Sequence, residues 1–161
     1  MTAYRTGLGW DVHPLTPGRQ LILGGVAIPS ELGLAGHSDA DVLAHAITDA
    51  ILGGLALGDI GMHFPDTDPR WRGADSARFV RHARTLLADR DYRIVNADLT
   101  LLAQSPKIAP WRDAMRDGVA DLLEIERACV NIKATTPEHL GFLGRKEGLA
   151  AMASVLLELG S

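Results

Sequence analysis

The sequence predicts an α+β fold, a single domain in which helices pack on one face of a mixed β-sheet. The chain has 161 residues, of which 47% are hydrophobic. This is enough for one well-packed domain and too little for two ordinary ones, so we expect residues 1–161 to form one domain. Segments with the two-residue period of strands are interleaved with segments that have the spacing of helices. The expected order is two strands, two helices, then strand, helix, strand and helix.

Four segments have the pattern of β-strands. Residues 4–12 and 20–28 are short apolar stretches that prolines and a glycine separate, which indicates two strands joined by a loop. Residues 95–101 alternate between apolar and polar side chains, and so do residues 130–135. Alternation of this kind is typical of a strand with one buried face.

Four other segments have the pattern of helices. Ser38 can cap a helix whose apolar residues recur at helical spacing over 39–57. Further helices are expected over 74–89, from beyond Pro106 to Leu123, and over 146–159. Between the first two helices, the segment from Gly58 to Gly73 is rich in glycine, proline and aspartate. A loop of this length is unusual in a compact domain and suggests a functional one.

The charge and hydropathy of the chain exclude several classes of function. With 20 acidic against 16 basic residues and a net charge of −4, the composition is not that of a nucleic-acid-binding protein. No apolar run approaches the roughly 20 residues that span a bilayer, and the N-terminus lacks the apolar core of a signal peptide. We therefore expect a cytoplasmic protein that binds neither nucleic acid nor a membrane. The single cysteine, Cys129, cannot form an intrachain disulfide.

Three residues suggest a metal site. Asp11 and His13 are two residues apart at the end of the first expected strand, so an extended backbone points both side chains to the same face. His45 lies one helical turn from Asp41 and from Asp49, so a carboxylate on the same helix face can orient its imidazole. Two imidazoles and one carboxylate suit zinc and leave a fourth position for substrate. A D-x-H pair alone is common by chance, and the acidic cluster before His45 favours metal binding without deciding the question.

Features suited to phosphate follow the last expected strand. The segment Thr135-Thr136-Pro137 is typical of a helix N-terminus, where free N–H groups can bind an anion. Glu138 stands beside it, and a carboxylate next to a phosphate makes sense chiefly if Mg²⁺ or Mn²⁺ bridges the two. An ordinary acidic residue in a first helical turn is the alternative interpretation of Glu138. Lys107 and Arg145 could supply positive charge from loops, or could equally lie on the solvated surface.

Six segments, taken together, resemble a known enzyme family. They are Gly7-Leu8-Gly9-Trp10-Asp11-Val12-His13, the His-Ser-Asp-Ala-Asp segment from His37, Gly58-Asp59-Ile60-Gly61, the Phe-Pro-Asp-Thr-Asp loop over 64–68, Ala103-Gln104-Ser105-Pro106-Lys107 and Lys133-Ala134-Thr135-Thr136. In this order and spacing they resemble the 2-C-methyl-D-erythritol 2,4-cyclodiphosphate synthase family over nearly the whole chain. Small departures, such as Ala40 where glycine is common and Pro137 where a third threonine is common, remove no ligand.

The resemblance implies a metal-dependent lyase of the non-mevalonate isoprenoid precursor pathway. Its substrate would be 4-diphosphocytidyl-2-C-methyl-D-erythritol 2-phosphate, and its products would be 2-C-methyl-D-erythritol 2,4-cyclodiphosphate and CMP. In this family the 2-phosphate of the substrate itself attacks the β-phosphorus. An anionic phosphate needs no general base, which explains why the sequence shows no Ser, Cys or Lys arranged as an activated nucleophile.

The resemblance also implies a role for each matching residue. Zinc would bind Asp11, His13 and His45, and Glu138 would hold the Mg²⁺ or Mn²⁺ that bridges the α- and β-phosphates. His37 and Thr136 would stabilise the transition state, and Asp11, His13, His37 and Glu138 would all lie against the substrate. The methylerythritol part would contact Ser38, Asp59, Ile60, Gly61, Phe64, Pro65, Asp66, Thr67 and Asp68. The cytidine and its phosphates would contact Ala103, Gln104, Ser105, Pro106, Lys107, Ile108, Ala109, Ala134, Thr135, Thr136 and Pro137.

The resembling family forms homotrimers with active sites between neighbouring subunits. One subunit would supply the zinc side of each site and the next subunit the nucleotide side, so trimerisation would be a condition of catalysis. Phe142 and Arg145 resemble positions that line a central cavity of the trimer, which can take an isoprenoid diphosphate. A feedback ligand of that class is therefore a secondary expectation.

Two other functions fit part of the sequence. The same three metal ligands with an open position could activate water in a zinc-dependent phosphohydrolase, which would release free phosphate instead of a cyclic diphosphate. A non-catalytic trimeric protein that carries isoprenoid diphosphates would use the metal structurally and would need a fourth protein ligand. The sequence offers no residue that we can identify as that fourth ligand, which argues mildly against the carrier.

Overall fold

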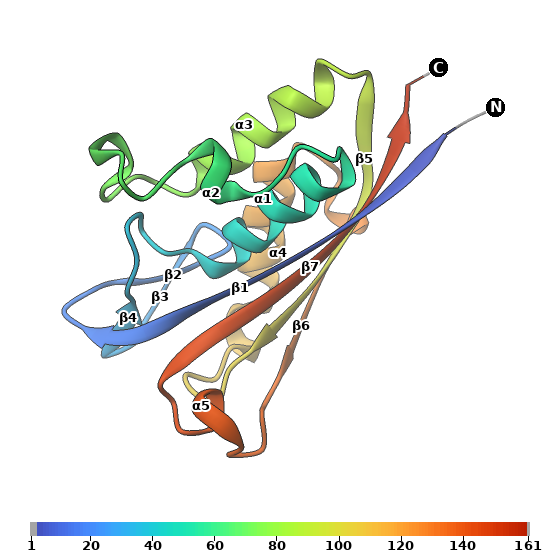
Figure 1. Ribbon diagram of the computed structural model, residues 1–161. Coiled ribbons are helices and arrows are strands. Elements are labelled where there is room, and N and C mark those ends of the chain that lie inside the picture. Colours follow the sequence, from blue (N-terminus) through green and yellow to red (C-terminus); the bar gives the residue numbers. More distant parts are fainter. Residues whose placement is uncertain (1–2, 161) are drawn as a thin grey trace.

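A five-stranded mixed sheet forms the frame of the molecule (Figure 1). The computed structural model describes residues 3–160. The strands follow the order β4-β1-β7-β5-β6, and β5 and β6 are parallel while the other neighbours are antiparallel. Their bounds are β1 (Tyr4–Pro17), β4 (Leu32–Leu34), β5 (Tyr92–Leu102), β6 (Val130–Thr135) and β7 (Gly148–Leu159). A separate antiparallel pair is formed by β2 (Leu21–Leu23) and β3 (Val26–Ile28).

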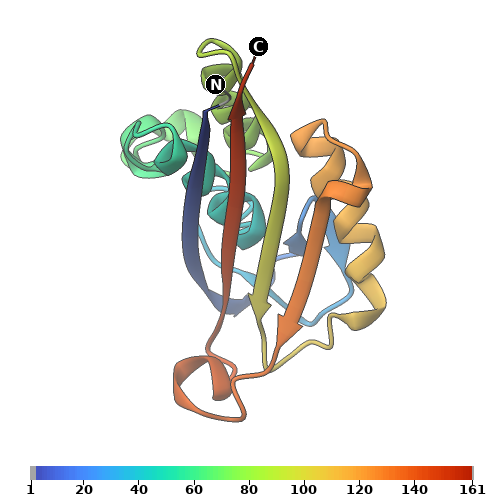
Figure 2. The ribbon, with the colours of Figure 1, turned by 90° about the vertical axis from the view of Figure 1, so that its right-hand side faces the viewer.

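The helices lie on one face of this sheet, and the opposite face of β1, β7 and β5 is turned to the viewer in Figure 2. The longer helices are α1 (Val42–Gly54), α3 (Ala77–Ala88) and α4 (Arg112–Leu123). Shorter turns are α2 (Ile60–His63), α5 (Gly141–Gly144) and the 3₁₀ segments η1 (Pro69–Trp71), η2 (Ala109–Trp111) and η3 (Arg127–Cys129). The core between the layers includes Leu43, Ile47, Ile51, Leu99, Leu101, Ile132 and Leu157, all buried. The predicted α+β class, with helices on one face of a mixed sheet, is confirmed.

The expected closing helix over 146–159 is wrong, because most of this segment forms β7 between β1 and β5. The alternate side chains Leu149, Ala151, Ala153, Val155 and Leu157 are buried beneath the helices. The other face of the strand also carries apolar residues, among them Ala150, Met152 and Leu156. Apolar residues on both faces satisfy the helical and the strand period alike, so pairing with two neighbouring strands decides the conformation.

The bounds of several other elements differ from the prediction. The first strand runs on to Pro17, and the expected strand over 20–28 is instead the short pair β2 and β3. The first helix begins at Val42, because Asp41 and not Ser38 caps it by accepting hydrogen bonds from the N–H groups of the next turn. The expected loop from Gly58 to Gly73 contains α2 and η1. None of the helices within residues 3–160 is long and apolar enough to cross a membrane.

Two glycines allow α1 to lie directly against β1. A Cβ atom at Gly7 would stand 1.8 Å from the carbonyl oxygen of Ala50, and a Cβ atom at Gly9 would stand 1.9 Å from that of Ala46. Any larger residue at either position would push the helix away from the strand. Because β1 continues from Gly9 to Asp11, and His45 precedes Ala46, this contact sets the distance between side chains from the two elements.

Substitution of Gly9 tests this contact. Gly9→Ala should lower the free energy of unfolding by roughly 1–3 kcal/mol or more, because the added methyl group collides with backbone that cannot move aside alone. The control is Gly53→Ala on the exposed side of α1, where a Cβ meets only the carbonyl oxygen of Leu8 at 3.9 Å. That variant should gain about 0.5–1 kcal/mol from helix propensity. Denaturant titration compares the two, and a Gly9→Ala protein as stable as the wild type would contradict the close approach.

Candidate functional site

Three side chains from β1 and α1 meet at the expected metal site. Oδ2 of Asp11 lies 2.9 Å from Nε2 of His13 and 3.0 Å from Nδ1 of His45, and these two nitrogens are 2.9 Å apart. Within residues 3–160, this is the group of His, Cys, Asp and Glu side chains whose ligand atoms come together closely enough to hold one ion. The structure therefore brings together the three residues that the sequence proposed as metal ligands.

Each histidine is oriented through the ring nitrogen that faces away from this group. Nδ1 of His13 lies 2.8 Å from the carbonyl oxygen of Ala35. Since a carbonyl oxygen only accepts, Nδ1 carries the proton, and Nε2 presents its lone pair to the site. Nε2 of His45 lies 2.9 Å from Oγ of Ser76 and 3.0 Å from Oγ of Ser38.

The expected carboxylate partner of His45 is wrong. Asp41 is buried and accepts hydrogen bonds from the N–H groups of Gly24 and Gly25 in addition to capping α1. Asp49 accepts a hydrogen bond of 2.7 Å from the N–H of Ile60. Helical spacing placed both carboxylates near His45, but backbone N–H groups outside α1 bind them instead. Tertiary contacts of this kind cannot be predicted from a local sequence pattern.

The charges of the three residues are coupled. Burial raises the pKa of Asp11, but its contacts with the imidazoles of His13 and His45 outweigh burial and hold this pKa far below its ordinary value. Burial lowers the pKa of His13, but the contact with Asp11 outweighs it, so the pKa of His13 lies above its ordinary value. Two imidazole nitrogens and a carboxylate oxygen that converge in this way fit a divalent transition metal, and they match the three-ligand sets of catalytic zinc sites.

The candidate metal centre opens into a hollow of about 600 Å³. Its walls are formed by Asp11, His13, His37, Ser38, His45, Ile60, Gly61, Phe64, Pro65, Asp66, Thr67, Trp71 and Phe79. Most residues expected around the methylerythritol part are thus gathered beside the metal ligands. Two residues expected around the methylerythritol part do not line the hollow. Asp59 accepts a hydrogen bond from the N–H of Met62 at the start of α2, and Asp68 caps η1 and pairs with Arg70.

Sequence reasoning missed two aromatic residues of this hollow. The ring centroid of Phe64 lies 4.5 Å from that of Phe79 and 5.0 Å from that of Trp71, and Phe79 also approaches His45 at 5.7 Å. Phe79 resembles any core residue of a helix, so no signal could have found it. Trp71 was a usable signal, because a large aromatic residue in a polar loop needs an apolar surface to cover it.

A second hollow, of about 330 Å³, lies at the carboxyl ends of β5 and β6. It is lined by Ala103, Gln104, Pro106, Lys107, Ile108, Ala109, Pro110, Ala134, Thr135 and Thr136, most of the residues expected around the nucleotide. The two hollows share no lining residue. Within one chain, His37 and Thr136 therefore face different hollows, although the resemblance implies that they act on one transition state.

The segment after β6 does not begin a helix, so the helix N-terminus expected at Thr135-Thr136-Pro137 is wrong. The chain turns through Glu138, an exposed residue with a φ of 53°, and α5 starts only at Gly141. Glu138 accepts a hydrogen bond from the hydroxyl of Thr136, which places it beside the second hollow. Phe142 is 44% exposed in α5, and Arg145 just after it pairs with Glu147 at 2.7 Å.

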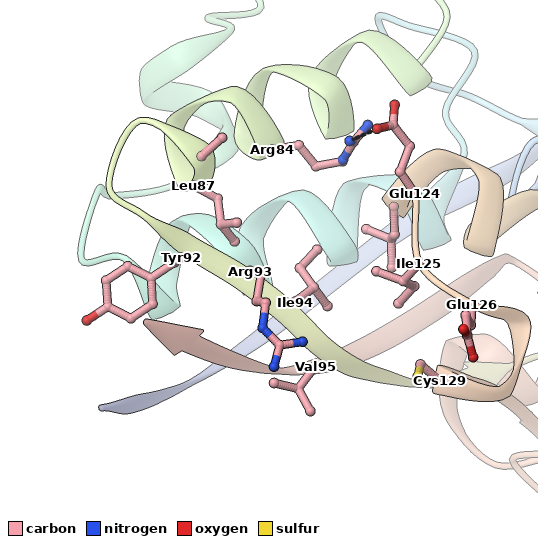
Figure 3. Close-up of a pocket in the computed structure, with 12 residues that line it drawn as sticks. Arg84, Leu87, Tyr92, Arg93, Ile94, Val95, Glu124, Ile125, Glu126 and Cys129 are labelled. Atoms are coloured by element: carbon pink, nitrogen blue, oxygen red, sulfur yellow. Dashed lines mark ion pairs between the residues drawn. The ribbon is translucent and has the colours of Figure 1, made fainter. Parts of the chain in front are cut away.

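A third hollow of about 510 Å³ lies between α3, β5 and the end of α4 (Figure 3). The side chains of Leu87, Ile94 and Ile125 point into it, while Arg84 and Glu124 form an ion pair at its edge. None of the residues proposed for a site lines it. The chemistry expected from the sequence therefore lies outside this hollow.

Fold and site together define a class of protein: an α+β domain with a His-His-Asp candidate metal centre in one hollow and a second hollow at the carboxyl ends of β5 and β6. The YgbB family matches residues 4–158. The chain therefore belongs to the YgbB family, as the sequence predicted, and it is an enzyme.

Similar proteins agree over nearly the whole chain. A protein of Geobacillus kaustophilus named 2-C-methyl-D-erythritol 2,4-cyclodiphosphate synthase is 59% identical over 155 residues, which cover 96% of this chain and 98% of that protein. The bifunctional IspDF structure from Campylobacter jejuni has a TM-score of 0.95 and 43% identity, and the match covers 99% of this chain but 43% of that one. The CDP complex of Plasmodium falciparum IspF has a TM-score of 0.87 and 34% identity, with 99% and 98% covered.

The raised pKa of His13 predicts how metal binding depends on pH. Zinc binds the neutral imidazole, so a proton on His13 competes with the metal. Because this pKa lies above the ordinary value of about 6.5, zinc affinity should begin to fall at a higher pH than a free imidazole would require, and it should fall further as the pH is lowered. Calorimetric titration with zinc from about pH 8 to pH 5 measures this. An affinity that is constant over this range would contradict the prediction.

Proposed function

We propose that the chain acts as one cyclodiphosphate synthase domain over residues 1–161. It converts 4-diphosphocytidyl-2-C-methyl-D-erythritol 2-phosphate into 2-C-methyl-D-erythritol 2,4-cyclodiphosphate and CMP, in the non-mevalonate isoprenoid precursor pathway. The observation that carries this proposal is the convergence of Asp11, His13 and His45 in a hollow, in a chain whose relatives are named for that product. Two similar structures are described as CDP complexes, which supports a cytidine diphosphate ligand.

The reaction is an intramolecular phosphoryl transfer. An oxygen of the 2-phosphate attacks the β-phosphorus, and a new P–O bond closes the ring. The bond between the β-phosphorus and the oxygen that bridges to the α-phosphate breaks, and CMP leaves with that oxygen. The attacking phosphate is already an anion, so the protein has to fold the substrate into the geometry of attack and to offset charge.

The residues of the first hollow suit this task. Zinc bound by Asp11, His13 and His45 would polarise the β-phosphate and offset its charge. Nε2 of His37 is buried in the hollow without a hydrogen-bond partner among residues 3–160, and buried polar atoms rarely stay unpaired. A phosphate oxygen of the substrate is the partner that we propose for it.

The second hollow would hold the nucleotide. The side chain of Lys107 and the hydroxyl groups of Thr135 and Thr136 can bind the ribose and its phosphates, and Thr136 would stabilise the transition state together with His37. Glu138, which contacts Thr136, would hold the Mg²⁺ or Mn²⁺ between the α- and β-phosphates.

A complete site needs both hollows around one substrate, so we propose a homotrimer with the site between subunits. The outer face of the sheet supports this, because it carries large apolar side chains: Tyr4 is 56% exposed, Leu8 65%, Trp10 50% and Met152 38%. Apolar patches of this kind mark interfaces. Phe142 and Arg145 would then line a central cavity for an isoprenoid diphosphate.

A charge on the sheet face tests the assembly. Trp10→Glu should convert the trimer into monomers and abolish synthesis, because a carboxylate would be buried without a partner in the interface. Zinc binding should survive, since Trp10 points away from Asp11 on β1. Sedimentation gives the mass of the assembly, and Thr85→Glu on the exposed side of α3 is the matched control that should remain a trimer. A Trp10→Glu protein that stays trimeric would show that this face is not the interface.

Phosphorus NMR tests the reaction itself. The purified protein with Mg²⁺ and the cytidine diphosphate substrate should form the cyclic diphosphate and CMP. Removal of zinc, or His45→Ala, should abolish product formation, because the β-phosphate then loses its main cation. Release of inorganic phosphate would instead identify a phosphohydrolase. If folded, zinc-loaded trimer shows no turnover, the protein is a non-catalytic binding protein.

A further inference from the structure

The hydroxyl of Ser76 stands behind the candidate metal centre in a chain of polar contacts. Ser76 is fully buried just before α3. Its Oγ lies 2.9 Å from Nε2 of His45 and 3.1 Å from Oγ of Ser38, and it also contacts Oδ1 of Asp39. The backbone N–H of Ser76 donates to the other oxygen of Asp39 at 3.1 Å. Asp39 thus holds Ser76 through two hydrogen bonds.

The protons of this chain follow from the chemistry of its groups. A carboxylate only accepts, so the single hydroxyl proton of Ser76 goes to Asp39. The oxygen of Ser76 can then only accept from His45, which places a proton on Nε2 of that ring. Nδ1 therefore keeps its lone pair, and Nδ1 is the atom that faces Asp11 and His13.

Ser38 completes the assignment. Its oxygen accepts from the N–H of Ala40 at 3.1 Å and lies within reach of the proton on Nε2 of His45. Its own proton is left for the oxygen of Ser76. Each donor in this buried group then has an acceptor, as buried polar groups require.

We infer that Ser76 is a positioning residue for the metal centre and that Asp39 acts through it. Together they fix the tautomer and the ring orientation of His45, so that Nδ1 is presented to the ion. Neither residue lines the hollow beside the metal ligands, so their effect reaches the substrate only through His45. The inference rests on the proposed function insofar as it assumes a metal at Asp11, His13 and His45.

Zinc affinity tests the inference, measured by competition with a chromophoric chelator. Ser76→Ala should bind zinc roughly 10–100-fold more weakly, the usual effect of removing the partner behind a metal-bound histidine. Thr48→Val is the matched control: Thr48 is also buried, and its hydroxyl donates to the carbonyl oxygen of Ala44 at 2.8 Å, one turn away along α1. It should bind zinc as the wild type does. A saturating zinc concentration should restore turnover by Ser76→Ala.

A second variant keeps the hydroxyl and removes its acceptor. In Asp39→Ala the proton of Ser76 can turn toward Nε2 of His45, which favours a proton on Nδ1, so zinc affinity should fall although Ser76 is intact. If both variants bind zinc as tightly as the wild type while His45→Ala loses zinc, the inference about Ser76 and Asp39 is overturned and the proposed metal site stands. If His45→Ala kept its zinc, the metal site and the proposed function would fail as well.

Discussion

The backbone contact between α1 and β1 is the constraint on which the candidate site depends. Gly7 and Gly9 face the helix, and the period of the strand puts Asp11 and His13 on that same face two and four residues further on. The helix meets the strand at the carbonyl oxygens of Ala46 and Ala50, so His45 arrives beside the two ligands of the strand. Because the two backbones touch directly, no side-chain rearrangement can change the distance between helix and strand. The positions of the candidate ligands are therefore set by the backbones of α1 and β1.

The loop before α1 extends this constraint to the rest of the site. Arg19 donates to the carbonyl oxygens of Gly36 and Ser38, and Asp41 ties the start of α1 to the turn between β2 and β3. Asp39 joins the same loop to the start of α3. One short segment therefore begins the helix that carries His45 and holds the helix that carries Phe79. These contacts fix the wall of the hollow next to the metal ligands, and the loop over 64–67 forms another part of its wall.

The sequence predicted those parts of the structure that depend on neighbours along the chain. The two-residue spacing of Asp11 and His13 on an extended backbone pointed to these two residues, and helical spacing identified the element that carries His45. It misassigned β7, because Ala150, Met152 and Leu156 make the outer face of that strand apolar, so the segment satisfies the helical period as well as the strand period. It also missed Ser76 as the partner of His45, since that contact joins residues 31 positions apart through the folding of α3 against α1. Each feature that the sequence did not predict depends on tertiary contacts between residues far apart along the chain.

The two faces of β1 bear on the proposed division of one site between two hollows. On one face the strand carries Asp11 and His13, and on the other it carries Leu8 and Trp10, whose exposed side chains we assign to the subunit interface. A partner that packs against the outer face would be positioned by the same strand that positions the metal ligands. The distance between the zinc side and the nucleotide side would then depend on one rigid element and not on a flexible loop. The transfer that we propose between two phosphates of one substrate needs that rigidity, because the reacting oxygen and phosphorus must be held within about 3–3.5 Å of each other.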